Sequence, residues 1–63
     1  MTPTKTTYAQ QAAAAARNGD YDNAAGLYTI AAIMAENDLD NAKSKRHRAK
    51  ADHFARMAER DCA

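Results

Sequence analysis

The segment from Gly19 to Ala31 constrains the fold more than any other part of the chain, because it combines a turn, a helix start and a helical packing pattern. Gly19 has no Cβ and readily takes the positive φ that often ends a helix. Asp20 follows it, and a carboxylate in this position commonly accepts hydrogen bonds from the first free amides of the next helix. The segment therefore predicts a helical hairpin with its joint at Gly19.

The residues after the joint alternate between aromatic and small side chains at helical spacing. Tyr21, Ala24, Tyr28 and Ala31 fall on one face of a helix. This alternation is typical of the packing surfaces of tetratricopeptide-like helix pairs. It serves contacts between helices and contains no reacting group, so it predicts an interaction protein rather than an enzyme.

The composition predicts strong helicity around a thin core. A chain of 63 residues forms one domain at most, and such a chain buries only about 60% of its unfolded surface. Seventeen alanines supply most of its apolar content, whereas Leu, Ile, Val and Phe together number five. Alanine favours helices but fills little volume. Chains of this kind usually gain the missing burial from disulfides, metals or self-association.

Cysteine usage and hydropathy predict a cytoplasmic location. Cys62 is the only cysteine, so no disulfide forms within one chain, and a lone thiol is typical of a reducing cytosol. The N-terminus lacks the apolar core of a signal peptide. The longest nearly apolar run, residues 24–35, has 12 residues, fewer than the roughly 20 that span a bilayer. We therefore expect no membrane partner.

Three helices account for the pattern, and we predict an all-α domain over residues 1–63. A frayed leader at 1–5 precedes helices at about 6–17, 21–36 and 39–60. We expect Thr4 or Thr6 to cap the first helix, Asp20 or Tyr21 to begin the second, and Asp38 to cap the third. The sequence leaves open whether the third helix folds back on the second or crosses to another subunit.

The second helix is apolar on several faces, which predicts self-association. A surface helix needs only one apolar stripe, and two short neighbours cover only part of this one. We expect a partner chain to cover the rest of the apolar surface of this helix in a homodimer. The alternative is a monomer whose alanine faces stay partly exposed to solvent. We assign to the core and dimer contacts Tyr8, Tyr21, Leu27, Tyr28, Ile30, Ile33, Met34, Leu39, Phe54 and Met57.

Charge is distributed unevenly along the chain. Residues 1–42 carry two basic and five acidic side chains, a net charge of −3, whereas residues 43–63 carry seven basic and three acidic ones, a net charge of +4. Within an octapeptide, five basic residues encircle the third helix at about 100° per residue. We expect them to serve partner binding rather than folding, with an acidic protein surface, nucleic acid or solvent alone as the alternatives. They are Lys43, Lys45, Arg46, Arg48 and Lys50.

Motifs for catalysis, cofactors and metals are missing from the sequence. His47 and His53 are six residues apart, about 240° around a helix, so they do not face one ion together. The chain has no Gly-rich phosphate loop, and Ser44 has no evident base beside it. We therefore predict no catalytic, cofactor or metal site and no small-molecule substrate.

Residues 8–50 resemble the small negative regulators of AraC-type transcription activators, a family of enteric bacteria and their phages. The resemblance lies in a Gly-x-Tyr-x-x-Ala-Ala-x-Leu-aromatic core at residues 19–28, with Tyr8 and Ala12 before it and Ala31, Ala32, Ala35, Asn41 and Arg48-Ala49 after it. The size is also similar to that of short early-region proteins of lambdoid phages.

The resemblance implies an all-helical, self-associating protein that binds a host regulatory protein and blocks its action. Two alternatives remain open from the sequence. One is a DNA-binding accessory protein, in which residues 43–50 would contact phosphates. The other is a tetratricopeptide-like adaptor, which also requires a partner because one repeat alone is unstable.

Overall fold

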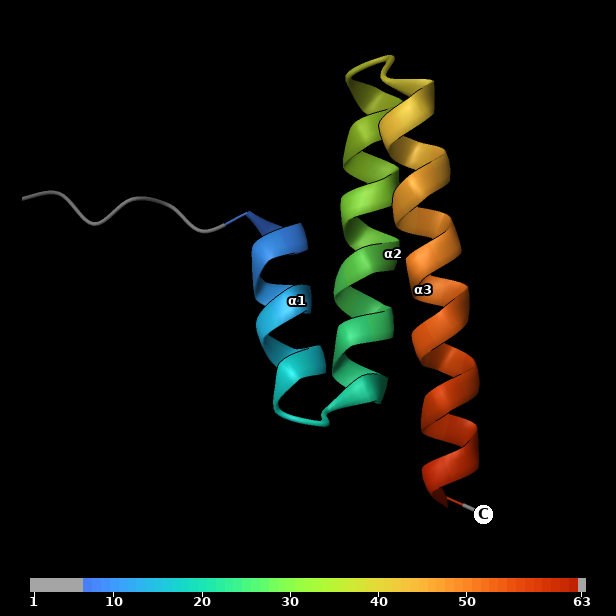
Figure 1. Cartoon of the computed structure of the whole chain (residues 1–63). Coiled ribbons are helices and arrows are strands. Elements are labelled where there is room, and N and C mark those ends of the chain that lie inside the picture. Colours follow the sequence, from blue (N-terminus) through green and yellow to red (C-terminus); the bar gives the residue numbers. More distant parts are fainter. Residues whose placement is uncertain (1–6, 63) are drawn as a thin grey trace, which may run out of the picture.

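Three α-helices form the part of the chain that the computed structural model describes, residues 7–62. They are α1 (Tyr8–Arg17), α2 (Tyr21–Asn37) and α3 (Asn41–Cys62). Helices α1 and α3 both pack on α2, which lies between them (Figure 1). The predicted all-α fold with three helices is confirmed, while the expected leader at 1–5 lies outside the described residues. None of these three helices has the length and apolar character needed to cross a membrane.

Helix α1 begins with a capping box. The Thr7 hydroxyl oxygen accepts a hydrogen bond from the Gln10 N–H at 3.1 Å, and the Gln10 side-chain oxygen accepts one from the Thr7 N–H at 3.0 Å. We expected Thr4 or Thr6 to act as the cap. Thr7 takes the role because it has a glutamine three residues later, the spacing that a capping box requires.

The joint between α1 and α2 is a Schellman motif. Gly19 has φ 78°, as expected, and its N–H donates to the Ala16 carbonyl at 3.1 Å. The Asp20 N–H donates to the Ala15 carbonyl at 2.9 Å. These two bonds satisfy carbonyls at the end of α1 that no helical amide reaches.

The expected side-chain cap at Asp20 is wrong. Asp20 precedes α2 but its carboxylate makes no capping hydrogen bond. Its backbone, at φ −89° and ψ 68°, lies away from the extended conformation of most N-cap residues. Only its carbonyl takes part in the helix, accepting the Ala24 N–H at 3.0 Å.

The joint between α2 and α3 repeats the same motif with a leucine in the glycine position. Leu39 has φ 59°; its N–H donates to the Glu36 carbonyl at 3.0 Å, and the Asp40 N–H donates to that of Ala35 at 2.9 Å. Asp40, not Asp38, caps α3, because its carboxylate accepts the Lys43 N–H at 3.1 Å. Helix α3 therefore begins at Asn41. The turn also leaves Leu39 87% exposed, so its assignment to the core is wrong.

Opposite effects on stability are expected from substitutions at the two joints. Gly19→Val should lower the free energy of unfolding by at least about 1 kcal/mol, because a β-branched residue is poorly tolerated at positive φ. Leu39→Gly should raise it by about 1 kcal/mol, because glycine relieves the same conformation. Urea denaturation followed by circular dichroism measures both changes, and a loss of stability in Leu39→Gly would contradict the account of this turn.

Alanines and one tyrosine form the core. Tyr28 is 5% exposed and packs with Ala12 of α1 and Ala51 of α3, so all three helices meet at its ring. The face of α2 that carries Tyr28 is buried at Ala24, Ala31 and Ala35, as the sequence predicts. The buried residues are Ala12, Ala24, Tyr28, Ala31, Ala32, Ala35, Ser44 and Ala51.

The larger apolar residues occupy the margins of this core or the surface. Tyr21, Leu27, Phe54 and Met57 are half-buried between the helices. Four further residues assigned to core and dimer contacts are 40–49% exposed, so they lie outside the core of the single chain, and their dimer contacts stay a prediction. Tyr8 lies in the first turn of α1, before the close contact at Ala12. The other three lie on the side of α2 away from Tyr28; they are Ile30, Ile33 and Met34.

Candidate protein interaction surfaces

A column of four rings joins α2 to α3. Phe54 of α3 stacks between Tyr21 and Tyr28 of α2, with ring centroids 5.9 Å and 5.7 Å away and planes within 6° and 8° of parallel. His47 continues the column on Tyr28, with centroids 5.9 Å apart. These separations are typical of offset-stacked rings, which gain attraction beyond the area that they bury. The aromatic column therefore fixes how α3 lies along α2.

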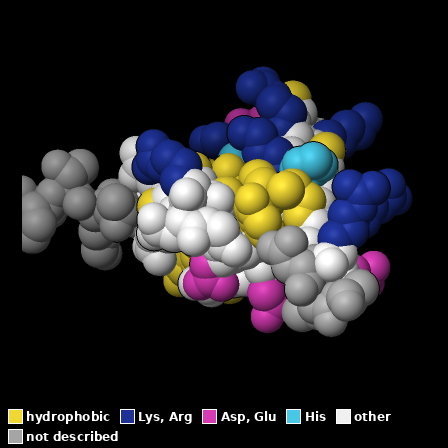
Figure 2. All heavy atoms as spheres, turned by 60° about the horizontal axis from the view of Figure 1, so that its bottom comes forward, with side chains coloured by type: hydrophobic (Ala, Val, Ile, Leu, Met, Phe, Trp, Pro, Cys, Tyr) yellow, Lys and Arg dark blue, Asp and Glu magenta, His cyan; other side chains and the backbone are white. Residues whose placement is uncertain are grey.

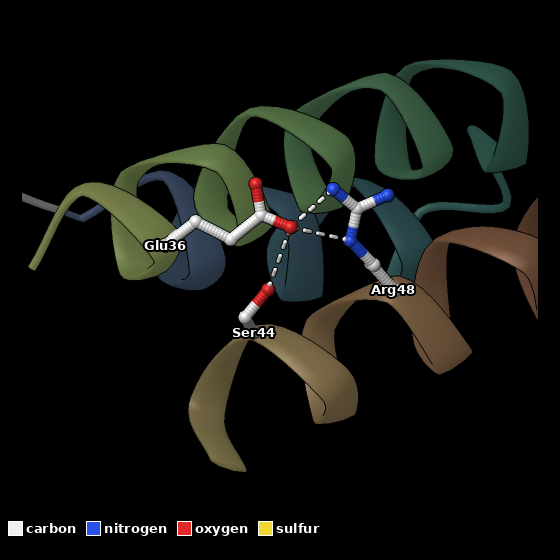
Figure 3. Close-up of polar contacts among 3 residues, drawn as sticks. All are labelled: Glu36, Ser44 and Arg48. Carbon is white, nitrogen blue, oxygen red and sulfur yellow. Dashed lines mark hydrogen bonds and ion pairs between the residues drawn. The ribbon is translucent and has the colours of Figure 1, made fainter. Parts of the chain in front are cut away.

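A polar cluster joins the same two helices nearer the α2–α3 joint (Figure 3). One oxygen of the Glu36 carboxylate accepts hydrogen bonds from the Ser44 hydroxyl at 3.3 Å and from Nε of Arg48 at 2.9 Å. Nη2 of Arg48 also pairs with this oxygen. Ser44 is only 4% exposed, so its hydroxyl serves the helix contact rather than the surface.

The five basic residues of the octapeptide do not have equivalent positions. Lys43, Arg46 and Lys50 follow each other at intervals of three and four residues, and so share one face of α3; we call them the basic stripe. Nζ of Lys50 also lies 5.6 Å from the centroid of the Tyr28 ring, within the range of a cation–π contact. Lys45 points elsewhere, and Arg48 pairs with Glu36.

Two of the five residues make contacts with α2 that the sequence did not predict, while their expected role in partner binding stays a prediction. Arg48 and Lys50 both reach side chains of α2 and so contribute to the packing of α3. Lys43, Lys45 and Arg46 are exposed, and the ion pairs among the described residues belong to Arg48 and Arg56 instead. These three remain candidates for partner binding alone.

His47 lies between the aromatic column and the basic stripe. Its Nδ1 is buried and has no hydrogen-bond partner among the described residues. Burial lowers the pKa of His47 below its ordinary 6.5, and the positive charges of Lys43, Lys50 and Arg46 lower it further, against a small opposing effect of Asp40. The neutral imidazole is therefore the form that suits this position.

Acidification should weaken the fold through His47. The lowered pKa means that the unfolded chain binds a proton at a pH where the folded chain does not, so stability is complete above about pH 6.5 and falls below it. Urea denaturation at about pH 7.5 and about pH 5.5 measures this difference. His47→Phe keeps a ring in the column but has no titrating group there, so its free energy of unfolding should change less between the two pH values. A change as large as that of the wild type would contradict the role of His47 in the pH dependence.

An apolar patch and the basic side chains share one face of the molecule. Figure 2 shows hydrophobic side chains gathered in the middle of this face, with Lys and Arg above and to the right and a histidine beside them. Asp and Glu side chains lie below the patch in the same view. An apolar area with a charged rim is typical of surfaces that bind other proteins.

A second apolar surface lies on α2. Ile30, Ile33 and Met34 are 42%, 47% and 49% exposed, and their spacing puts them on one face of the helix. Neither α1 nor α3 covers this face, which we call the outer face of α2. Because large apolar side chains gather here on a helix whose other side is buried, the face is available to another molecule.

The other described polar side chains show no metal-binding arrangement. Within residues 7–60, for which side chains are described, no three His, Cys, Asp or Glu residues come together in a way that would hold a metal ion. His53 contacts the edge of the Phe54 ring, with centroids 5.1 Å apart. The side chain of Cys62 lies outside the described part.

Comparisons with protein-family models, curated proteins and solved structures give no match to this chain. Its candidate surfaces are therefore defined by the burial, contacts and charge of its own residues.

Proposed function

We propose that this protein is a small regulatory interaction protein, which works as a homodimer and binds an acidic surface of a host transcription regulator to block its action. The observation that carries the proposal is the basic stripe. Lys43 and Arg46 project from α3 and pair with no carboxylate among the described residues. Such charges steer and orient an acidic partner, which supplies the opposite sign.

The surroundings of the stripe support a protein partner. Phe54 is half-buried beside it, and Lys50 lies over the Tyr28 ring. An interface that combines apolar contact with complementary charge gains affinity from the first and orientation from the second. A partner that offers carboxylates next to apolar side chains fits this surface.

The resemblance of residues 8–50 to the negative regulators of AraC-type activators supports the choice of target. An AraC-type activator of an enteric bacterium is the partner that we propose, with the protein made by the bacterium or by a phage that infects it. Binding in the cytoplasm of that host would keep the activator from its DNA or from its own partner subunit.

Two double variants of equal charge test the stripe. Lys43→Gln with Arg46→Gln removes two charges from the stripe, whereas Lys45→Gln with Arg60→Gln removes two charges elsewhere on α3. Calorimetry with a purified AraC-type activator should show affinity about tenfold or more lower for the first variant, because close charge pairs typically contribute this much. The second variant should bind nearly as the wild type does.

Equal losses in both variants would indicate a general charge effect and contradict recognition by the stripe. Circular dichroism serves as the control, because both variants should keep the helicity of the wild type. Absence of binding to any AraC-type activator would contradict the choice of target.

Salt dependence separates this proposal from binding to nucleic acid. Affinity for duplex DNA through several phosphates falls by orders of magnitude between ~50 and ~200 mM salt, whereas a partly apolar protein interface weakens far less. If DNA is the partner, the wild type would then bind a DNA duplex tightly at low salt, with this steep salt dependence, and the stripe variant would not bind it. That result would contradict the protein partner and favour DNA.

A further inference from the structure

The outer face of α2 is an apolar surface that α1 and α3 leave uncovered. Ile30 lies two residues after Tyr28, about 200° around the helix, and the exposed fractions are 42% for Ile30 and 5% for Tyr28. Ile33 and Met34 extend the same face by one turn, with 47% and 49% exposed. The helix therefore has a buried side and, directly opposite, an apolar side open to solvent.

Gly26 provides a second and independent observation on this face. It lies one turn before Ile30, inside α2, and a Cβ built on it would meet no atom within 4 Å. Its φ is not positive, since Gly19 is the glycine of that kind in the described chain. Glycine destabilises a helix interior relative to alanine. Nothing within the described chain requires this glycine, but the close approach of a second backbone would.

The charge of the face favours a copy of this chain over a charged partner. Helix α2 contains no Lys or Arg, and its two carboxylates are Asp22 in the first turn and Glu36, which is occupied by Ser44 and Arg48. A two-fold interface brings the same surface of both chains together, so a charged face would repel itself. The neutral outer face of α2 meets that condition.

Shape selects an antiparallel arrangement. In an antiparallel pair that crosses at Ile30, Gly26 faces the partner's Met34, so the long side chain fills the space that glycine leaves. A parallel pair would instead place glycine on glycine and leave this space unfilled. The antiparallel pair also opposes the helix dipoles favourably.

We infer that the outer face of α2, formed by Gly26, Ile30, Ile33 and Met34, binds the same face of a second copy of this chain, with the two α2 helices antiparallel and crossing at Ile30. The inference rests on the homodimer of the proposed function and specifies the surface that builds it. The basic stripe lies on α3, so each subunit of this dimer keeps its stripe free for a partner.

A bulky residue at Gly26 tests the surface. A Cβ at the exposed Gly26 has no atom of the described chain within 4 Å, and leucine favours a helix over glycine, so the Gly26→Leu monomer should fold at least as well as the wild type. The dissociation constant of the dimer, from sedimentation equilibrium, should rise by about tenfold or more, because overfilling a close contact typically has an effect of this order. Ala49→Leu, at an exposed position of α3, is the matched control and should leave the constant unchanged.

Cysteine cross-linking tests the register in a Cys62→Ser background. Ile30→Cys should form a disulfide-linked dimer on oxidation, because it lies at the crossing. Asn23→Cys and Asn37→Cys should each stay uncrosslinked alone but crosslink when mixed, since antiparallel α2 helices bring these positions together. Efficient crosslinking of Asn23→Cys with itself would overturn the antiparallel register.

These outcomes separate the surface from the proposed function. If Gly26→Leu dimerises as tightly as the wild type, the outer face of α2 is not the dimer surface, although a homodimer stands. If Gly26→Leu becomes monomeric and still binds the AraC-type activator, the surface is confirmed and partner binding does not need it. If the wild type is monomeric, both the homodimer and this surface are wrong.

Discussion

Replacing Tyr28 with alanine should lower the free energy of unfolding by about 3–5 kcal/mol, the usual cost of truncating a buried aromatic residue. The ring is 5% exposed, stacks with Phe54 and His47, and meets Ala12 and Ala51 from the other two helices. A domain of this size has a total stability of roughly 3–9 kcal/mol. The variant should therefore be largely unfolded as a monomer at room temperature.

Tyr28→Phe is the matched control for this truncation. It keeps the ring in the column and removes only the hydroxyl, so its stability should stay within about 1 kcal/mol of the wild type. Far-UV circular dichroism and urea denaturation measure both variants. A Tyr28→Ala protein with the helicity and urea midpoint of the wild type would show that the core lies elsewhere.

Ala24→Leu should lower the free energy of unfolding by about 1–3 kcal/mol, because the larger side chain has no space at a closely packed helix contact. Ala24 is fully buried on the face of α2 that carries Tyr28. In a loosely packed core, an added leucine would bury more apolar surface and raise the free energy of unfolding. A decrease in the free energy of unfolding therefore indicates a close-packed contact at Ala24.

The same substitution at an exposed position provides the comparison. Ala49→Leu on α3 should change the free energy of unfolding by no more than about 0.5 kcal/mol. Thermal melts of the two variants, at equal concentration, measure the difference. An Ala24→Leu variant that melts above the wild type would indicate an unfilled cavity at this contact.

Features carried by sequence-local chemistry could be predicted from the sequence. The joint at Gly19 follows from the conformational freedom of glycine, and the buried face of α2 follows from helical periodicity. The second joint lacked this signal, because Leu39 takes the positive φ without being glycine. Leucine is typical of cores and of helices. The sequence therefore predicted wrongly that Leu39 is buried and that the third helix begins at this residue.

Contacts between helices could not be predicted in the same way. Periodicity shows which residues share a face of one helix, but not which residue of another helix meets them. Phe54 was expected in the core, yet its place between Tyr21 and Tyr28 depends on the lengthwise position of α3 along α2. Ser44 lies between two lysines in the sequence, which gives no sign that it is buried against Glu36.

The different positions of the five basic residues also depend on contacts between helices, so the sequence did not predict them. The five residues are chemically alike in sequence, and only the packing of α3 shows that Arg48 and Lys50 contact α2 while Lys43 and Arg46 do not. Helical spacing in the sequence places Lys43, Arg46 and Lys50 on one face, apart from Lys45 and Arg48. It does not indicate that Lys50 of this face contacts Tyr28.

Sedimentation equilibrium of the wild-type protein at micromolar concentration tests self-association, the central claim, most directly. One chain has a mass of 6.8 kDa, so the expected homodimer has twice that mass, about 13.6 kDa. Dimerisation through the outer face of α2 also predicts no weakening between ~50 and ~200 mM salt, because that face is uncharged. A single species of 6.8 kDa throughout the micromolar range would contradict the account.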